Sequence, residues 1–141
     1  MLRRMLWPTV LVLAMAGVLL PASSAAAKTS ATVTISHVMR GCHSWQFNGG
    51  TLKPSLSVTV RAGTVLKFVN NDVMPHKLIQ RAGPKLGLTR ANMSHMSAST
   101  SVTLAKKGLY RFTTKAGEDY KGIAMKTIGE DHVLHLSVLV K

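Results

Sequence analysis

The octapeptide VNNDVMPH at residues 69–76 decides the fold of this chain. It follows the run TVLKF at 64–68, whose β-branched and aromatic residues predict a strand, and the turn signal RAG at 61–63 precedes that run. The Asn-Asn-Asp cluster ends the strand, and Pro75 fixes the backbone just before His76. A histidine held by a rigid turn at the mouth of a strand is placed as a metal ligand would be. A surface turn that ends in histidine is the alternative, and both stay open at this point.

Alternating apolar residues predict further short strands on both sides of this stretch. In the first, Val33 and Ile35 share a face with His37, which we expect to be a hydrogen-bonded core histidine. The expected strands lie at about 32–39, 56–60, 64–68, from 78 onward, 102–104, 109–114 and 133–140, separated by loops at 40–54, 81–100 and 115–131. Seven or eight strands with turn signals at this spacing predict an all-β sandwich.

Residues 1–27 have the pattern of an export signal. Arg3 and Arg4 form a basic start, an apolar run follows at 10–20, and small residues end at Ala27. The apolar run is too short for a transmembrane helix. We therefore expect cleavage near Ala27, export to the periplasm or the extracellular space, and no transmembrane segment in the mature chain.

The remaining residues, 28–141, are enough for one domain with a two-sheet core. They carry 16 basic and 5 acidic residues, a net charge of +11. The charges are scattered singly, without the interleaved aromatic residues of a protein that binds single-stranded nucleic acid. The pattern favours a solvated basic surface over nucleic-acid binding, and an acidic protein or an anionic envelope surface as the electrostatic partner.

Two motifs resemble the cupredoxins, the small copper β-sandwiches that include plastocyanin and amicyanin. One is the run VRAGTVLKFVNND at 60–72 with MPH at 74–76, and the other is AKKGLYRF at 105–112. The resemblance covers about residues 56–141. It implies a cupredoxin-like Greek-key β-sandwich of seven or eight strands, copper as the cofactor, and His76 as the first histidine ligand.

The chain departs from the cupredoxin pattern in the loop that usually supplies a cysteine, a histidine and a methionine. Aligned on GLY at 108–110, the family cysteine falls on Thr114 and the family histidine on Gly117, so neither ligand is carried over. The methionine has a counterpart in Met125, in a longer loop.

Strand directions bring several ligand-type side chains to one end of the predicted sandwich. Successive strands reverse direction, so the loops at 40–54, 71–76 and 115–131 share an end, and the excursion at 81–100 returns toward it. A strand of six residues is about 20 Å long, so a side chain at the other end could not reach a shared ion. The residues predicted to gather there are Cys42, His43, His76, Met125 and His95.

Four of these residues, Cys42, His43, His76 and Met125, make a set of two imidazoles, a thiolate and a thioether. That set suits a copper electron-transfer site. The single cysteine of an exported chain has no intramolecular disulfide partner, so its thiol needs another role, as a ligand, an intermolecular bridge or a buried apolar group. Because neighbouring residues can share an ion only from an irregular loop, His95 or His132 are alternatives to His43.

A second group of soft ligands lies in the Met93–Met96 segment, where His95 and Met96 join Met93. It predicts a weaker copper site or a delivery surface, with core packing as the alternative for methionine. Trp45 is expected to cover the main site or to fill the end of the sandwich, and His135 to face solvent.

The sequence therefore predicts an exported copper-binding protein, with a one-electron carrier as the leading function. Copper sequestration or delivery, and a metal-free interaction module, are the alternatives. Its expected partners are a copper ion and an acidic redox or copper-exchange protein, not nucleic acid. The chain has no nucleophile elbow, HExxH pair or phosphate loop, which favours a binding protein over an enzyme.

Overall fold

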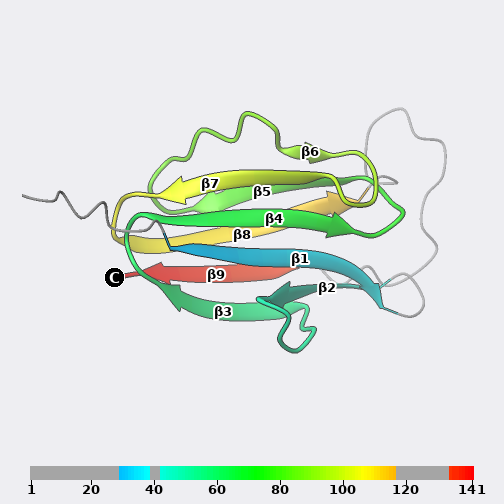
Figure 1. The fold of residues 1–141 in the computed structure, drawn as a ribbon, viewed down its shortest axis with the longest axis horizontal. Coiled ribbons are helices and arrows are strands. Elements are labelled where there is room, and N and C mark those ends of the chain that lie inside the picture. Colours follow the sequence, from blue (N-terminus) through cyan, green and yellow to red (C-terminus); the bar gives the residue numbers. More distant parts are fainter. Residues whose placement is uncertain (1–28, 39–41, 117–133) are drawn as a thin grey trace, which may run out of the picture.

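The computed structural model describes residues 29–38, 42–116 and 134–141, and these residues form two mixed β-sheets packed as a sandwich (Figure 1). The first sheet has the strand order β2-β1-β4-β7, and the second has the order β3-β9-β8-β5-β6. The strands are β1 (Ser30–Val38), β2 (Cys42–Phe47), β3 (Ser55–Val60), β4 (Thr64–Asn71), β5 (His76–Ala82), β6 (Asn92–Met93), β7 (Ser99–Leu104), β8 (Gly108–Ala116) and β9 (His135–Val140). The predicted all-β sandwich is confirmed.

Within this sandwich, β1 runs parallel to β4 and β3 runs parallel to β9, whereas the other pairs are antiparallel. Parallel neighbours that are not consecutive in the chain require crossovers between the sheets, as in a Greek-key arrangement. The parallel pairing of β1 with β4 matters for function, because Ser36 lies opposite Asn71 and both strands therefore finish at the same end.

The prediction of one long loop at 40–54 was wrong, because this segment contains β2. The strand pairs with β1 from Val38 opposite Cys42 to Val33 opposite Phe47. Its Trp45 side chain is fully buried and meets Phe68 edge to face, with ring centroids 6.3 Å apart. Glycine and polar residues around Trp45 hid a strand that is stabilised by packing and pairing rather than by its own alternation. The excursion at 81–100 likewise contains the short strand β6, so the described residues form nine strands.

The core lies between the sheets, and its main cluster of buried side chains is apolar. In β9 and just before it, Leu134, Leu136, Val138 and Val140 are all buried, as their alternation predicted. Burying one such side chain contributes roughly 1.5–3 kcal/mol to folding. We therefore expect this apolar core to hold the sandwich together without a metal ion.

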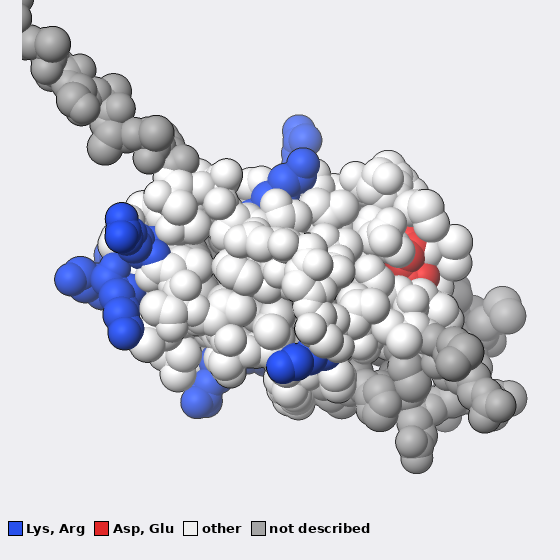
Figure 2. Space-filling model, turned by 60° about the horizontal axis from the view of Figure 1, so that its bottom comes forward, with Lys and Arg blue, Asp and Glu red and all other residues white. Residues whose placement is uncertain are grey.

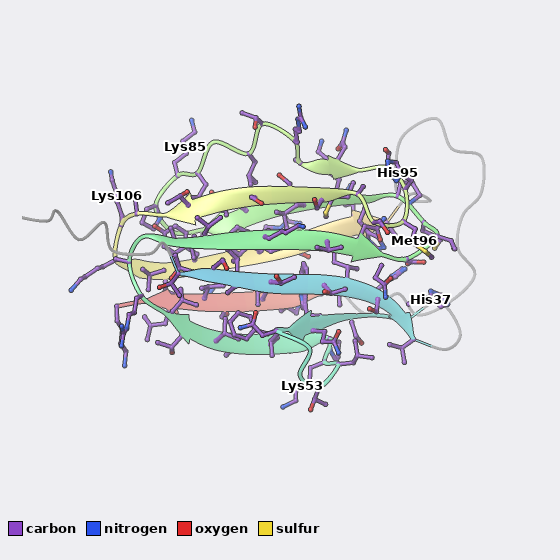
Figure 3. The ribbon with its side chains drawn as sticks, in the orientation of Figure 1. His37, Lys53, Lys85, His95, Met96 and Lys106 are labelled. Carbon is purple, nitrogen blue, oxygen red and sulfur yellow. The ribbon has the colours of Figure 1, made fainter. Side chains whose placement is uncertain are left out.

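The two ends of the sandwich differ in the side chains that they carry (Figure 3). His37, His95 and Met96 lie at one end, and Lys85 and Lys106 lie at the other. We call the first the histidine end, defined by His37, His43, His76 and His95.

The predicted export signal at 1–27, together with Met125 and His132, lies outside the described residues. Among the described residues, no helix has the length and apolar character needed to span a bilayer.

Candidate metal centre

Asn70, near the end of β4, organises the turn that leads to the centre. Its side chain is fully buried, and Nδ2 donates hydrogen bonds to the carbonyl oxygens of Met74 (2.7 Å) and Met93 (3.1 Å). Its Oδ1 accepts a hydrogen bond from the Asp72 amide at 2.9 Å, which closes an Asx turn. One amide side chain thus ties the β4–β5 turn to β6.

This turn directs the carboxylate of Asp72 into the interior, where it meets three imidazoles. Asp72 Oδ2 lies 3.0 Å from His76 Nε2 and 3.0 Å from His43 Nε2, and His37 Nδ1 is 3.9 Å away. The rings of His43 and His76 meet edge to face with centroids 4.7 Å apart, and those of His37 and His43 do so at 5.6 Å. The side chains of Asp72 and His76 are fully buried, and that of His43 is nearly so.

Each member of the cluster is placed by a different part of the fold. His37 and His43 lie directly opposite each other on the antiparallel pair β1 and β2, so their side chains point to the same face of the sheet. His76 is the first residue of β5, directly after Pro75. Because β1 and β4 end together, the β1–β2 hairpin and the β4–β5 turn meet at the histidine end.

The electrostatics of the cluster keep Asp72 ionised. Burial alone would raise its pKa, but the hydrogen bond from His76 and the one from the Met74 amide oppose this effect, as do the charges of His43 and His76, so the pKa lies below its usual value. A carboxylate anion only accepts hydrogen bonds. In the metal-free protein, therefore, the Nε2–H group of His76 donates a hydrogen bond to Asp72 Oδ2 at 3.0 Å, and His43 Nε2 approaches the same oxygen to 3.0 Å.

The same atoms also suit a bound metal ion. The candidate ligand atoms of His37, His43 and Asp72 all lie within 4.8 Å of one another. Two ligands that share an ion at about 2.0–2.1 Å lie roughly 3.3 Å apart in a tetrahedral site, close to the 3.0 Å that separates Asp72 Oδ2 from each Nε2. Imidazole donors with one carboxylate fit copper(II) or zinc, and a thiolate or thioether would shift the preference toward copper.

The structure brings two of the predicted ligands, His43 and His76, side by side. The backbone of Cys42 opens β2 directly before His43, so this residue is at the histidine end; its side chain, like Met125, lies outside what the structure describes. His95 and Met96 are exposed at the same end, and His95 Nδ1 lies 2.8 Å from the Met96 carbonyl oxygen. No described contact joins them to the Asp72 cluster.

One expectation about this end was wrong, and for Met93 the alternative of core packing holds. His37 has the inward phase of Val33 and Ile35, but 42% of its side chain is exposed, because it lies past the buried part of β1; its ring contacts that of His43. Met93 was grouped with His95 and Met96, but it is fully buried opposite His76 on β5 and β6. The Met93–Met96 segment is therefore divided between the core and the surface.

Sequence reasoning missed Asp72 as a member of the centre and interpreted it only as a residue that ends a strand. A signal was present: Asp72 is the only acidic residue between positions 28 and 117, in a strongly basic chain, and it precedes His76 by four residues. A lone carboxylate among apolar residues and a histidine is unlike the scattered acids of a solvated surface.

No protein-family model and no curated protein matches this chain. Similar solved structures include a purple cupredoxin from Nitrosopumilus maritimus, at 11% identity over 81% of this chain and 100% of that chain, with a TM-score of 0.43. Amicyanin from Paracoccus versutus is similar at 18% identity over 85% of this chain and 87% of that one, with a TM-score of 0.43. A multi-copper oxidase from Pseudomonas thermotolerans has 11% identity and a TM-score of 0.46; the match covers 81% of this chain but only 29% of the oxidase.

These similarities concern the fold alone. Because each TM-score is below 0.5, the fold assignment rests on the chain's own two-sheet topology and on the motifs at 60–76 and 105–112, which resemble those of the cupredoxins.

Proposed function

We propose that this chain is a copper-binding protein and that the ion binds at the histidine end through His43, His76 and Asp72. The observation that carries the proposal is the convergence of two imidazole nitrogens on one buried carboxylate oxygen, each at 3.0 Å. A third imidazole nitrogen, His37 Nδ1, lies 3.9 Å from the same oxygen. Cys42 and Met125, the soft ligands inferred from the sequence, complete the proposed set.

The role that this centre supports best is one-electron transfer. A bound copper ion would supply a one-electron redox couple. The chain would contribute a rigid frame, because two paired strands and the Asn70 hydrogen bonds fix the histidines and limit rearrangement between oxidation states. His37 would offer a path for the electron to the surface. Its side chain is partly exposed and its ring contacts that of His43, so only the His37 ring would separate a partner bound there from His43.

A specific observation favours a second function, copper sequestration or delivery. Met96 is 48% exposed beside the exposed His95, at the same end as the buried cluster. A thioether and an imidazole at the surface suit transient binding of copper(I) before transfer to a buried site or to a partner. Under either function we propose export, directed by residues 1–27, and an acidic protein partner for the basic chain.

Copper binding is tested by metal analysis, a visible spectrum, and separate titrations with copper(II) and copper(I). We expect one tightly bound copper ion in the wild type. His76→Ala should weaken binding by more than about 100-fold, since loss of a residue that only supports a ligand already costs 10–100-fold. The matched control is His135→Ala, which removes an exposed imidazole from β9 and should leave binding unchanged.

A wild type that binds no copper would contradict the proposal and favour the metal-free interaction module. Tight copper(I) binding without redox cycling would replace the electron carrier by sequestration or delivery. Equal losses in His76→Ala and His135→Ala would place the ion elsewhere.

A further inference from the structure

The end of the sandwich opposite the histidine end carries a group of exposed cations. We call it the basic pole and define it by Arg61, Lys85, Lys106 and Lys107. Figure 3 places Lys85 and Lys106 at this end, away from His37 and His95. In Figure 2 the densest group of lysine and arginine side chains also lies at one end of the visible face.

The backbone holds the three turns that carry these cations side by side. The β3–β4 turn is tied to the end of β9 by a hydrogen bond from the Ala62 amide to the Lys141 carbonyl, and to the end of β7 by one from the Gly63 amide to the Leu104 carbonyl. Gly63 has φ 84°, and Gly108, which has φ 141°, opens β8 against Pro84. These left-handed positions favour glycine and fix the turns. The grouping of charge therefore belongs to the fold and does not depend on chance side-chain rotamers.

Described acidic side chains do not offset this charge. Asp72 is the only acidic residue in the part of the chain that the structure describes, and it is buried at the histidine end. Exposed cations without nearby carboxylates create a positive potential that reaches about a Debye length, roughly 10 Å at 0.1 M salt.

We propose that the basic pole docks on an anionic phospholipid surface, with the strands upright and the histidine end facing away from the lipid. Three of the four cations are lysines on turn tips, and their flexible ammonium groups suit a diffuse layer of headgroups better than the paired geometry of one protein carboxylate.

The orientation has a consequence for access to the centre. The eight residues of β4 span roughly 25 Å. Docking by the pole therefore holds the histidine end well outside the headgroup layer, open to a partner in solution.

The test is co-sedimentation of the purified protein with vesicles of phosphatidylcholine, with and without phosphatidylglycerol. Each cation near such a surface strengthens binding about five-fold. The variant Lys106→Glu/Lys107→Glu should therefore bind phosphatidylglycerol vesicles at least about thirty-fold more weakly than the wild type. Binding should also fall sharply between about 0.1 M and about 1 M salt, where the Debye length shrinks to ~3 Å.

The matched control is Lys53→Glu/Lys67→Glu, which makes the same change in net charge at exposed positions outside the turns of the pole: Figure 3 shows Lys53, and Lys67 lies within β4, opposite Ser101. It should retain most of the binding. Equal losses in the two variants would show attraction to net charge only and would overturn the proposal. The proposal would also be overturned if the wild type bound equally well to vesicles with and without phosphatidylglycerol, or if it bound an acidic protein but not the vesicles.

Two further arms keep the result interpretable. Thermal unfolding confirms that each variant is folded, and Lys106→Gln/Lys107→Gln, with an expected loss of about thirty-fold, replaces the charge reversal if that variant does not fold. Binding should be the same with and without copper, since the pole and the cluster lie at opposite ends. Dependence on copper would overturn docking by the pole.

Discussion

The histidine end and the basic pole are made from the same strands, yet the charge at the first is buried and the charges at the second are exposed to water. At the histidine end a carboxylate is buried among imidazoles and held by an internal hub, Asn70. At the basic pole, cations remain in water on turns whose shape is set by backbone hydrogen bonds. A buried charge requires specific hydrogen-bond or ion-pair partners, whereas an exposed charge is solvated by water and requires none.

This difference predicts where the protein is sensitive to substitution. Changes at the histidine end should affect both folding and binding, because the same side chains satisfy buried polar groups and face the proposed ion. Changes at the basic pole should affect association only.

Replacing the hub should have the largest effect. Asn70→Ala leaves the carbonyl oxygens of Met74 and Met93 and the Asp72 amide without their side-chain partner. Each unsatisfied buried group costs about 1–3 kcal/mol, so we expect a loss of about 3 kcal/mol or more in the free energy of unfolding, measured with urea. The neighbouring exposed residue supplies the control: Asn71→Ala should change stability by less than about 0.5 kcal/mol. Similar costs at both positions would contradict the role of Asn70.

Removing the buried charge should have the next effect, and it should depend on pH. The pKa of Asp72 is lower in the folded state, so its contribution is present above the unfolded value of about 3.9 and is lost as pH falls through the folded pKa. The groups that face it are His37, His43 and His76.

For Asp72→Asn, urea unfolding of the metal-free protein at neutral pH should show a loss of about 1–3 kcal/mol. The gap to the wild type should narrow as the solution is acidified below about pH 4. A gap that stays constant, or widens in acid, would mean that the carboxylate is not held by the imidazoles.

Cys42→Ser should change the spectrum with little change in the fold. If the thiolate binds copper(II), the wild type shows an intense visible charge-transfer band that the serine variant lacks. We expect the band and the reversible redox response to disappear, while the thermal midpoint of the metal-free protein shifts little, since the apolar core holds the sandwich. A colourless wild-type complex with copper(II) would leave the histidines and Asp72 as the ligands and would remove Cys42 from the centre.

The smallest effect on stability should come from the pole. Lys106→Ala/Lys107→Ala removes two exposed side chains that are in no described ion pair, and the Lys106 carbonyl that accepts from the Tyr110 hydroxyl is unaffected. We expect a change within about 0.5 kcal/mol per site in the free energy of unfolding, measured with urea. A larger loss would show that the pole contributes to the fold and is not only a surface.

The sequence by itself determined the strands whose side chains alternate and the direction in which each of those strands runs. Leu134, Leu136 and Val138 face the core as their period of two requires, and counting reversals brings His43 and His76 to one end. Both results follow from local rules, because alternation and turns are properties of neighbouring residues.

Only the tertiary structure decided how deeply each side chain is buried and which residues it contacts. His37 has the predicted phase but lies past the end of the core, and β2 exists because β1 pairs with it. Asp72 became the centre of the cluster because a hairpin more than 25 positions away along the chain brings His37 and His43 against the turn before His76. Periodicity fixes the face on which a side chain lies, but burial and electrostatic partners depend on strands that are remote in the sequence.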